Sequence, residues 1–185
     1  GKLINIKATA TVMCAGIWSD QLHESFGLKP GYHVTMSKGV HIVLPKSAIK
    51  STEGIILKTD KSVLFLIPWA NQWLVGTTDT PYTEDRSRPL ADRSDVEYII
   101  NEANKVLKPK LKIEDVIGVY AGLRPLVSNN KDSETTKLSR EHTVDRSAPG
   151  FVSIAGGKYT TYRVMGKDVI DLAGVELRRL VADSV

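Results

Sequence analysis

Several kinds of site have no basis in this sequence, because the residues that they need are scarce. The 185 residues include one cysteine, which excludes an internal disulfide framework and any zinc or iron–sulfur site built from several cysteines. A protein with a single cysteine, and so without an internal disulfide, is compatible with a reducing compartment. The four histidines show no metal-ligand spacing, so the sequence predicts no metal site.

Long apolar runs and concentrated charge are also missing. No uninterrupted apolar stretch approaches the roughly 18 residues that a membrane-spanning helix needs. The 25 basic and 21 acidic residues give a net charge of +4, and they are spread along the chain, so no nucleic acid partner is indicated. The sequence begins at Gly1 without an initiator methionine or the apolar run of a signal peptide. We interpret it as a piece of a longer chain.

Three motifs that would identify an enzyme class directly are absent. The sequence has no GxSxG of a nucleophile elbow. It also has no P-loop and no GxGxxG dinucleotide fingerprint. Its function must therefore be sought in weaker patterns.

Apolar spacing predicts a mixed α+β fold. Runs rich in β-branched residues predict strands at 3–6, 8–14, 40–44, 54–58, 63–67, 73–75, 115–120 and 151–155. Helical spacing predicts helices at 19–26, 94–107 and 160–172. The middle strands follow one another with short turns, which favours an antiparallel meander. The polar stretch 128–140 is predicted to be an exposed loop.

Element ends and core positions follow from single residues. Ser94 and Glu97 predict a capping box, and Gly174 is predicted to end the last helix. Cys14 lies in an apolar run and is predicted to belong to the core. In the strand at 40–44, His41 is predicted to face away from its apolar neighbours.

The segment from Ala155 to Thr161 joins a predicted strand to a helix start. Unpaired backbone N–H groups at such a start favour negative charge, and Gly156 and Gly157 allow close backbone approach. Lys158 adds a full positive charge. A phosphate, a carboxylate or the electron-rich edge of a reduced flavin would suit this cradle. The alternative is an ordinary glycine turn followed by an N-capping threonine.

Arg124 follows a predicted strand, with Pro125 favouring an extended backbone and Gly122 clearing space beside the side chain. Its guanidinium is suited to an oxyanion. The alternative is a surface arginine that pairs with Asp115 or Glu114.

Two further polar positions also leave alternatives open. His41 is either a general base or a hydrogen-bonded structural residue. Asp79, within the threonine-rich turn at 77–80, either belongs to turn chemistry or orients a catalytic or cofactor-binding partner.

Four parts of the chain together resemble one family, the flavin-dependent glycerol-3-phosphate dehydrogenases, within the wider group of D-amino-acid-oxidase-like flavoproteins. The parts are VMCAGIWSD at 12–20, SKGVHIVLP at 37–45, IPWANQWLVGTTDT at 67–80 with GLRPL at 122–126, and GGKYTTYR at 156–163. The first part and GLRPL occur loosely across the wider group. The other elements are more characteristic of the glycerol-3-phosphate enzymes.

The resemblance implies oxidation of sn-glycerol 3-phosphate to dihydroxyacetone phosphate, with hydride transfer to FAD and onward transfer to a quinone or to oxygen. It implies catalytic roles for His41, Arg124 and Lys158. His41 resembles a base or hydroxyl partner, Arg124 an anchor for the phosphate or the reacting oxygen, and Lys158 an electrostatic partner of flavin and substrate. The implied flavin contacts are Ala15, Gly16, Gly156, Gly157, Lys158, Thr160 and Thr161.

The resemblance also implies a domain organisation. A substrate-binding domain at 28–126, with an antiparallel or mixed sheet, is flanked at 1–27 and 127–185 by partial pieces of a Rossmann-like FAD-binding domain. The glycine fingerprint for the FAD pyrophosphate and the family's C-terminal helical domain are absent from these residues. Cys14 and Ala15 also replace the usual Ala-Thr before Gly16. We therefore expect this piece to be inactive by itself.

The remaining expectations concern location, partners and competing functions. The family is cytoplasmic, often attached peripherally to the inner face of the cytoplasmic membrane, and a homodimer is compatible with the sequence. Two other functions stay open: a related flavin oxidoreductase acting on an amine or a hydroxy acid, and a non-catalytic binding module. A substrate panel and the sequence upstream of Gly1 would separate them.

Overall fold

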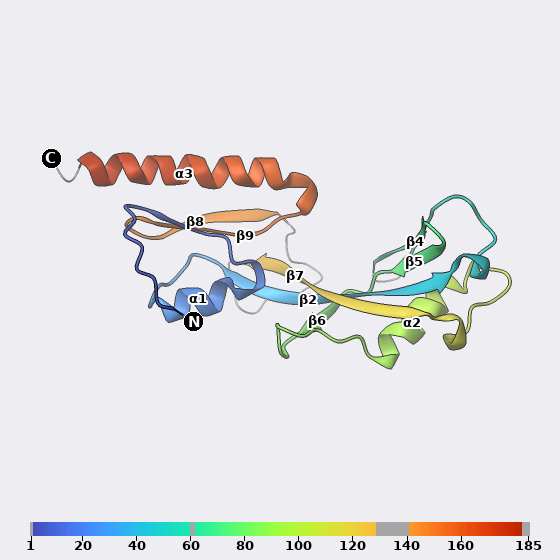
Figure 1. Cartoon of the computed structure of the whole chain (residues 1–185). Coiled ribbons are helices and arrows are strands. Elements are labelled where there is room, and N and C mark those ends of the chain that lie inside the picture. The colour runs from blue at the N-terminus through green and yellow to red at the C-terminus, as the bar shows by residue number, and fades with distance from the viewer. Residues whose placement is uncertain (1, 60–61, 129–140, 183–185) are drawn as a thin grey trace. The chain divides into compact units, whose positions relative to one another are not determined.

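The computed structural model describes residues 2–59, 62–128 and 141–182, and the chain forms two compact units (Figure 1). We call Ser37–Arg124 the central unit, and Gly1–Met36 with Pro125–Val185 the terminal unit. Two long strands, β2 (His33–Pro45) and β7 (Gly118–Ser128), contribute residues to both units. The mixed α and β composition is confirmed. The division at 27/28 and 126/127 stays a prediction, because a compact unit does not by itself assign a function.

A sheet with a long antiparallel part carries the central unit. The described strands lie in the order β3–β4–β5–β2–β6, and β7 also pairs with β2. Strands β3, β4 and β5 pair antiparallel in chain order, as the predicted meander requires. The prediction is wrong for β2, which pairs antiparallel with β5 instead of with β3. The bounds of the strands not yet given are Ile55–Lys58 for β3, Val63–Trp69 for β4, Gln72–Gly76 for β5 and Thr80–Tyr82 for β6.

The two faces of β2 have different roles. Val40, Ile42 and Leu44 are fully buried and form one core cluster with residues of helix α2 (Arg93–Ala103). Burying side chains of this size contributes about 1.5–3 kcal/mol each. His41 alternates with them and is only partly buried, so it faces away from the apolar core as its position predicts.

Helix α2 begins earlier than its sequence pattern predicts. The capping residue is Asp92, whose carboxylate accepts a hydrogen bond from the Asp95 backbone, while the Asp95 carboxylate accepts one from the Asp92 backbone. The predicted box of Ser94 and Glu97 is therefore wrong, since aspartate caps a helix as well as serine does. The helix also ends at Ala103 instead of 107, although Leu107 still packs in the core.

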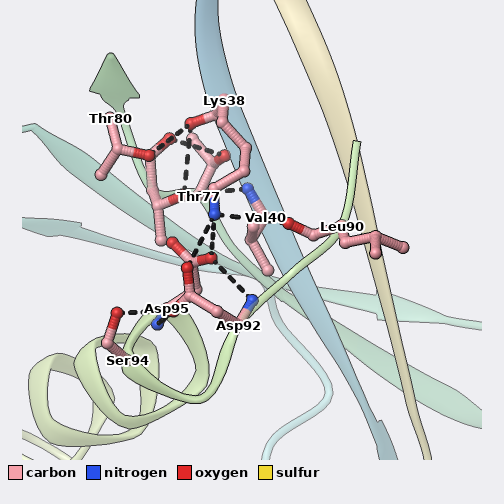
Figure 2. A network of polar contacts seen from close by, with 9 residues as sticks. Lys38, Val40, Thr77, Thr80, Leu90, Asp92, Ser94 and Asp95 are labelled. Carbon is pink, nitrogen blue, oxygen red and sulfur yellow. Dashed lines mark hydrogen bonds and ion pairs between the residues drawn. The ribbon is translucent and has the colours of Figure 1, made fainter. Parts of the chain in front are cut away.

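A buried ion pair links the start of α2 to β2 (Figure 2). The Lys38 ammonium lies 2.6 Å from the Asp95 carboxylate and 3.0 Å from that of Asp92. The side chains of Lys38 and Asp95 are only 9% and 4% exposed. Burial alone would lower the pKa of Lys38, but its hydrogen bonds to Asp95 and Asp92 raise that pKa above its ordinary value.

Replacing Lys38 by methionine is expected to reduce the free energy of unfolding by about 3–5 kcal/mol, because the Asp95 carboxylate stays buried without its partner. Urea unfolding of the chain measures the change. The exposed Lys58 on β3, replaced by methionine, is the control and should change stability by less than about 0.5 kcal/mol. Adding Asp95→Leu to Lys38→Met should recover stability, and equal effects of the two single lysine variants would contradict the ion-pair account.

The terminal unit contains a smaller sheet in the order β1–β9–β8. Strand β1 (Thr11–Met13) runs parallel to β9 (Phe151–Gly156), and β8 (His142–Ala148) runs antiparallel to β9. Helix α3 (Tyr162–Ala182) packs on β8 and β9. Its Val169 and Ala173 bury against Val152 and Ile154. Because β1 and β9 are parallel, the turns that follow them lie at one edge of this sheet.

The other elements of the described residues are a short helix and single 3₁₀ turns. Helix α1 spans Ser19–Ser25 and is followed by Gly27 with a φ of +65°, so the predicted helix and its glycine stop are confirmed. Single 3₁₀ turns lie at Gly16–Trp18, Lys46–Ala48, Ile113–Asp115 and Tyr159–Thr161. No helix in the described ranges is long and apolar enough to cross a membrane.

Several predictions for the terminal unit are wrong. Residues 3–6 form no strand, and the side chains of Leu3, Ile4 and Ile6 are more than 70% exposed. Cys14 is exposed instead of buried, because β1 is shorter than predicted and ends at Met13. Helix α3 does not end at Gly174 but continues to Ala182, since Gly174 keeps an ordinary negative φ.

The loop prediction at 128–140 is only partly testable. Ser128 is the buried last residue of β7, so it does not belong to an exposed loop, and residues 129–140 lie outside the described residues. Strand β8 was missed because its sequence, HTVDRSA, has mostly polar residues. Arg146 in this strand is paired with the buried Glu176 of α3.

Candidate functional site

One face of the central sheet gathers polar and glycine positions. Gly39 and His41 alternate along β2, so they share its face, and His41 lies opposite Gly76 of β5. Tyr120 and Arg124 share a face of β7, which pairs with β2. This arrangement brings His41 and Arg124 into one cluster.

The His41 ring is held by stacking. It lies parallel to the Tyr120 ring, with centroids 5.0 Å apart and planes 6° apart. A side chain at Gly76 would overlap it, because an ideal Cβ there would be 2.5 Å from His41 Cδ2. Burial, and then the positive charge of Arg124, lower the pKa of His41 below its ordinary value. Both effects favour the neutral form of His41, and a neutral imidazole can accept a proton.

The Arg124 guanidinium is fixed by the turn at 77–79. Its Nη2 donates to Thr77 Oγ1 at 2.7 Å, and its Nη1 donates to the Thr78 carbonyl at 3.2 Å. Asp79 lies 3.9 Å from Nη1 and accepts a hydrogen bond from the buried Ser37. The Arg124 side chain is still 28% exposed, so an anionic ligand can reach this cation.

The same turn is tied to β2 by hydrogen bonds around Lys38 (Figure 2). The Val40 backbone donates to Thr78 Oγ1 at 3.0 Å. The hydroxyls of Thr78 and Thr80 each lie 3.4 Å from the Lys38 carbonyl. The turn that holds Arg124 is therefore fixed to the strand that carries His41.

In the terminal unit, two glycine turns follow the parallel strands β1 and β9 at the same edge of the sheet. Ala15 and Gly16 follow β1, and Gly16 has a φ of +55°. Gly156 and Gly157 stand at the end of β9 with φ of +77° and +80°. An ideal Cβ at Gly156 would lie 2.6 Å from a carbonyl oxygen, and one at Gly157 would lie 2.5 Å from Met165 Sδ. Only glycine fits these two positions without a shift of the surroundings.

The 3₁₀ turn at Tyr159–Thr161 links this glycine turn to the start of α3. The Lys158 carbonyl accepts hydrogen bonds from the backbone and the hydroxyl of Thr161, both at 3.0 Å. Lys158 and Thr160 are exposed. A cavity of about 390 Å³ is lined by Lys158, Thr161, Glu141, His142 and Val164, and the His142 imidazole lies 2.8 Å from the Asp168 carboxylate.

A family model described as FAD dependent oxidoreductase matches residues 2–169. The chain belongs to this family. A glycerol-3-phosphate dehydrogenase of Mycobacterium leprae is 44% identical over all 185 residues, which are 32% of its length. The crystal structure of a glycerol-3-phosphate dehydrogenase from Bacillus halodurans complexed with FAD has 33% identity and a TM-score of 0.81, over 94% of this chain and 33% of that one. The chain thus spans about a third of these relatives.

A further solved structure is similar to this chain in fold alone. Glycine oxidase from Bacillus cereus has 16% identity and a TM-score of 0.60. The match covers 90% of this chain and 43% of the oxidase. This likeness concerns the fold alone, so the substrate of this chain has to be argued from side chains.

The terminal unit of this FAD dependent oxidoreductase chain fits its cofactor chemically. Both glycine turns lie where parallel strands end, and in α/β sheets ligands bind in the crevice beyond that edge. The 21-residue helix that follows presents its N-terminus there, with Lys158 beside it. Backbone N–H groups at the helix start, together with the Lys158 ammonium, suit the electron-rich edge of a flavin.

The predicted site residues therefore divide between the units. His41 and Arg124 belong to the central unit, while Lys158 and the predicted flavin contacts belong to the terminal unit. Their roles stay predictions at this point. Within the described residues, no group of three or more His, Cys, Asp or Glu side chains is placed to hold a metal ion.

Sequence reasoning missed the residues that position His41 and Arg124. Tyr120 lies four residues before Arg124 in β7, so strand alternation would have placed both on one face. Gly122 was expected to clear space for Arg124, but an ideal Cβ at Gly122 meets no atom within 4 Å. The space is provided at Gly39 instead. That assignment needed the pairing of β7 with β2, which no local pattern reveals.

Replacing Arg124 by alanine is expected to raise the pKa of His41, because the neighbouring positive charge that disfavours the imidazolium is removed. The burial contribution remains, so the pKa should still lie below the ordinary value of a histidine. NMR titration of the His41 ring carbons measures the shift. Arg93→Ala, at an 81% exposed arginine of the same unit, is the control. An unchanged His41 pKa in Arg124→Ala would show that the two groups do not interact.

Proposed function

We propose that this chain carries part of the flavin site and the substrate side chains of an enzyme that oxidises sn-glycerol 3-phosphate to dihydroxyacetone phosphate. The observation that carries the proposal is the pair of an imidazole stacked on Tyr120 and a fixed guanidinium on one sheet face. The 44% identity to the mycobacterial glycerol-3-phosphate dehydrogenase supports the choice of substrate.

The reaction removes two electrons and two hydrogens from the secondary alcohol. The C–H and O–H bonds of carbon 2 break and a carbonyl forms. FAD, when bound, accepts the hydride with its two electrons. The protein must therefore supply a group that takes the hydroxyl proton and cations that bind the phosphate and the developing negative charge on oxygen.

His41 is the base in this proposal. Burial and Arg124 lower the pKa of its imidazole and so favour the neutral form, in which a ring nitrogen can accept the hydroxyl proton. Stacking on Tyr120 restricts the orientation of the ring. A base whose orientation is already restricted loses less entropy when it reaches the reactive geometry.

Arg124 is the oxyanion partner in this proposal. A guanidinium stays charged at all working pH values and can bind an oxygen anion with two parallel N–H groups. Its contacts with Thr77 and Thr78 fix its orientation before substrate arrives. A fixed donor stabilises the charge that develops on the reacting oxygen without reorganising during the reaction.

Lys158 and the glycine turns of the terminal unit serve the flavin. We assign Ala15, Gly16, Gly156, Gly157, Thr160 and Thr161 to flavin contacts, since the turns offer backbone approach and the helix start offers N–H donors. Lys158 supplies positive charge at the same place. It favours negative charge on the cofactor.

The proposal extends to the surroundings of the enzyme. Electrons leave to a quinone, with oxygen as the alternative acceptor. A cytoplasmic location with peripheral attachment to the inner face of the cytoplasmic membrane gives access to a membrane quinone, and a homodimer is compatible with this arrangement.

A substrate panel on the whole flavoprotein tests the proposed substrate. Dye reduction is measured with glycerol 3-phosphate, glycerol, lactate and glycine at equal concentrations. We expect glycerol 3-phosphate to be oxidised at least about 100-fold more efficiently than glycerol, because a phosphate dianion makes charge-assisted contacts with a protein that glycerol cannot make. Preference for glycine or lactate would instead assign the chain to an amine or hydroxy-acid oxidoreductase.

A further inference from the structure

We propose that Gly39 is a positioning residue for Arg124: the missing side chain at this position makes the space in which the guanidinium lies. The geometry of the space is independent of the substrate. Its consequence for catalysis rests on the proposed function, in which Arg124 binds the reacting oxygen.

The space is defined by three short separations. An ideal Cβ on Gly39 would lie 2.3 Å from Nη2 of Arg124 and 2.6 Å from both Cζ and Nη1. Real Cβ atoms essentially never come within 3.0 Å of such neighbours. Any residue other than glycine at this position must therefore displace the guanidinium.

The backbone does not require glycine here. Gly39 lies inside β2 and is not among the glycines with positive φ, so alanine can adopt its conformation without strain. Glycine within a strand weakens the strand and often marks a close approach by another group. At Gly39 the approaching group is the Arg124 guanidinium, which is the functional explanation for its presence.

The guanidinium has little freedom to avoid a new methyl group. It donates to Thr77 Oγ1 at 2.7 Å and to the Thr78 carbonyl at 3.2 Å. The turn that carries these acceptors is itself tied to Val40, the residue after Gly39, because the Val40 backbone donates to Thr78 Oγ1. Moving the guanidinium away from position 39 therefore breaks or lengthens the contacts that orient it.

Two other glycines near the site serve for comparison with Gly39. An ideal Cβ at Gly122, two residues before Arg124 on β7, meets nothing within 4 Å. Gly122→Ala is therefore a matched control with no expected effect on Arg124. At Gly76 an added Cβ would also lie 2.8 Å from the Val40 carbonyl, so a variant there would disturb the backbone as well and is a poorer test.

The first test is a double-mutant cycle on kcat/KM for glycerol 3-phosphate in the whole flavoprotein. Gly39→Ala should lower kcat/KM by about 100-fold, the loss expected for a misplaced catalytic group. In an Arg124→Ala background, Gly39→Ala should change it by less than about twofold, because nothing remains to be displaced. Equal losses in both backgrounds would overturn the proposal, since they would show a role for Gly39 that does not pass through Arg124.

The second test needs no substrate, so it separates a failure of this proposal from a failure of the proposed function. ¹⁵N NMR of the chain follows the Nη signals of Arg124, which hydrogen bonds to Thr77 and Thr78 should keep distinct. We expect averaged or shifted signals in Gly39→Ala and unchanged signals in Gly122→Ala. Unchanged signals in Gly39→Ala would overturn the positioning role whatever the substrate is.

Whether the variants fold is a further test of the proposed role of Gly39. If Gly39→Ala does not fold but Gly39→Ala with Arg124→Ala does, the overlap with Arg124 is the cause and the proposal is supported. If both fail to fold, Gly39 is needed for another reason and the proposal is overturned. Circular dichroism and the thermal midpoint of each variant report this outcome.

Discussion

Arg124→Ala in the whole flavoprotein is expected to lower kcat/KM for glycerol 3-phosphate by about 10²–10³-fold, the cost of removing one fixed oxyanion donor. The effect should be large because this guanidinium is held ready by Thr77 and Thr78 and does not reorganise when substrate binds. Steady-state dye reduction over a range of substrate concentrations measures it. The loss should appear in kcat as well as in KM, since the charge on oxygen develops only in the transition state.

Two companion variants sharpen the Arg124 result. Arg124→Lys keeps the positive charge but loses the planar fork, so it should recover only part of the activity. Arg93→Ala removes an arginine that is 81% exposed and pairs with Glu97 on α2, and it should leave kcat/KM within about twofold. A rate for Arg124→Ala as high as that of Arg93→Ala would remove Arg124 from the site.

His41→Asn is expected to lower kcat by about 10²–10⁴-fold, the usual contribution of a positioned general base. The variant should also lose the acid limb of the pH profile. In the unaltered enzyme, activity should fall as the pH drops below the pKa of His41, because protonation removes the base. That limb should lie below the ordinary pKa of a histidine, since burial and Arg124 both lower the pKa of His41.

The pH profile separates a base from a structural histidine. His33→Gln, at a half-exposed histidine 3.9 Å from Asp20, is the matched control and should leave both the rate and the acid limb unchanged. An acid limb that persists in His41→Asn would assign the titration to another group. In that case His41 would be a structural residue, as its strand position alone also allows.

The sequence predicts most of the central unit because its periodicity is strong there. Val40, Ile42 and Leu44 alternate with His41 and Val43, and the structure buries the first three fully. The same alternation correctly places His41 on the face away from the core. Local patterns were sufficient where one strand face is apolar and the other is polar.

The sequence predictions fail where tertiary contacts determine which residues form a strand, a helix end or a helix cap. Strand β8 has polar side chains, and its place in the sheet depends on antiparallel pairing with β9 along its length. Gly174 looks like a helix stop, yet α3 continues past it with a negative φ at the glycine, and Glu176 beyond it is buried and pairs with Arg146 of β8. Asp92 replaces Ser94 as the cap of α2, where its carboxylate also pairs with the buried Lys38.

The candidate site shows the same limit. His41 and Arg124 could be singled out from local motifs, but the groups that position them come from distant segments. Gly39 and Arg124 are 85 positions apart in the numbering of the chain, and they meet only because β7 pairs with β2. Strand pairing of this kind is a long-range property, which one sequence does not specify.

Anaerobic mixing of the whole flavoprotein with glycerol 3-phosphate, followed by the flavin absorbance, tests the central claim most directly. We expect rapid bleaching with glycerol 3-phosphate, bleaching slower by about 10²-fold or more in Arg124→Ala, and almost none with glycerol. Bleaching that is equally fast with glycerol, or unaffected by the loss of Arg124, would contradict a site in which His41 and Arg124 act on a phosphorylated alcohol.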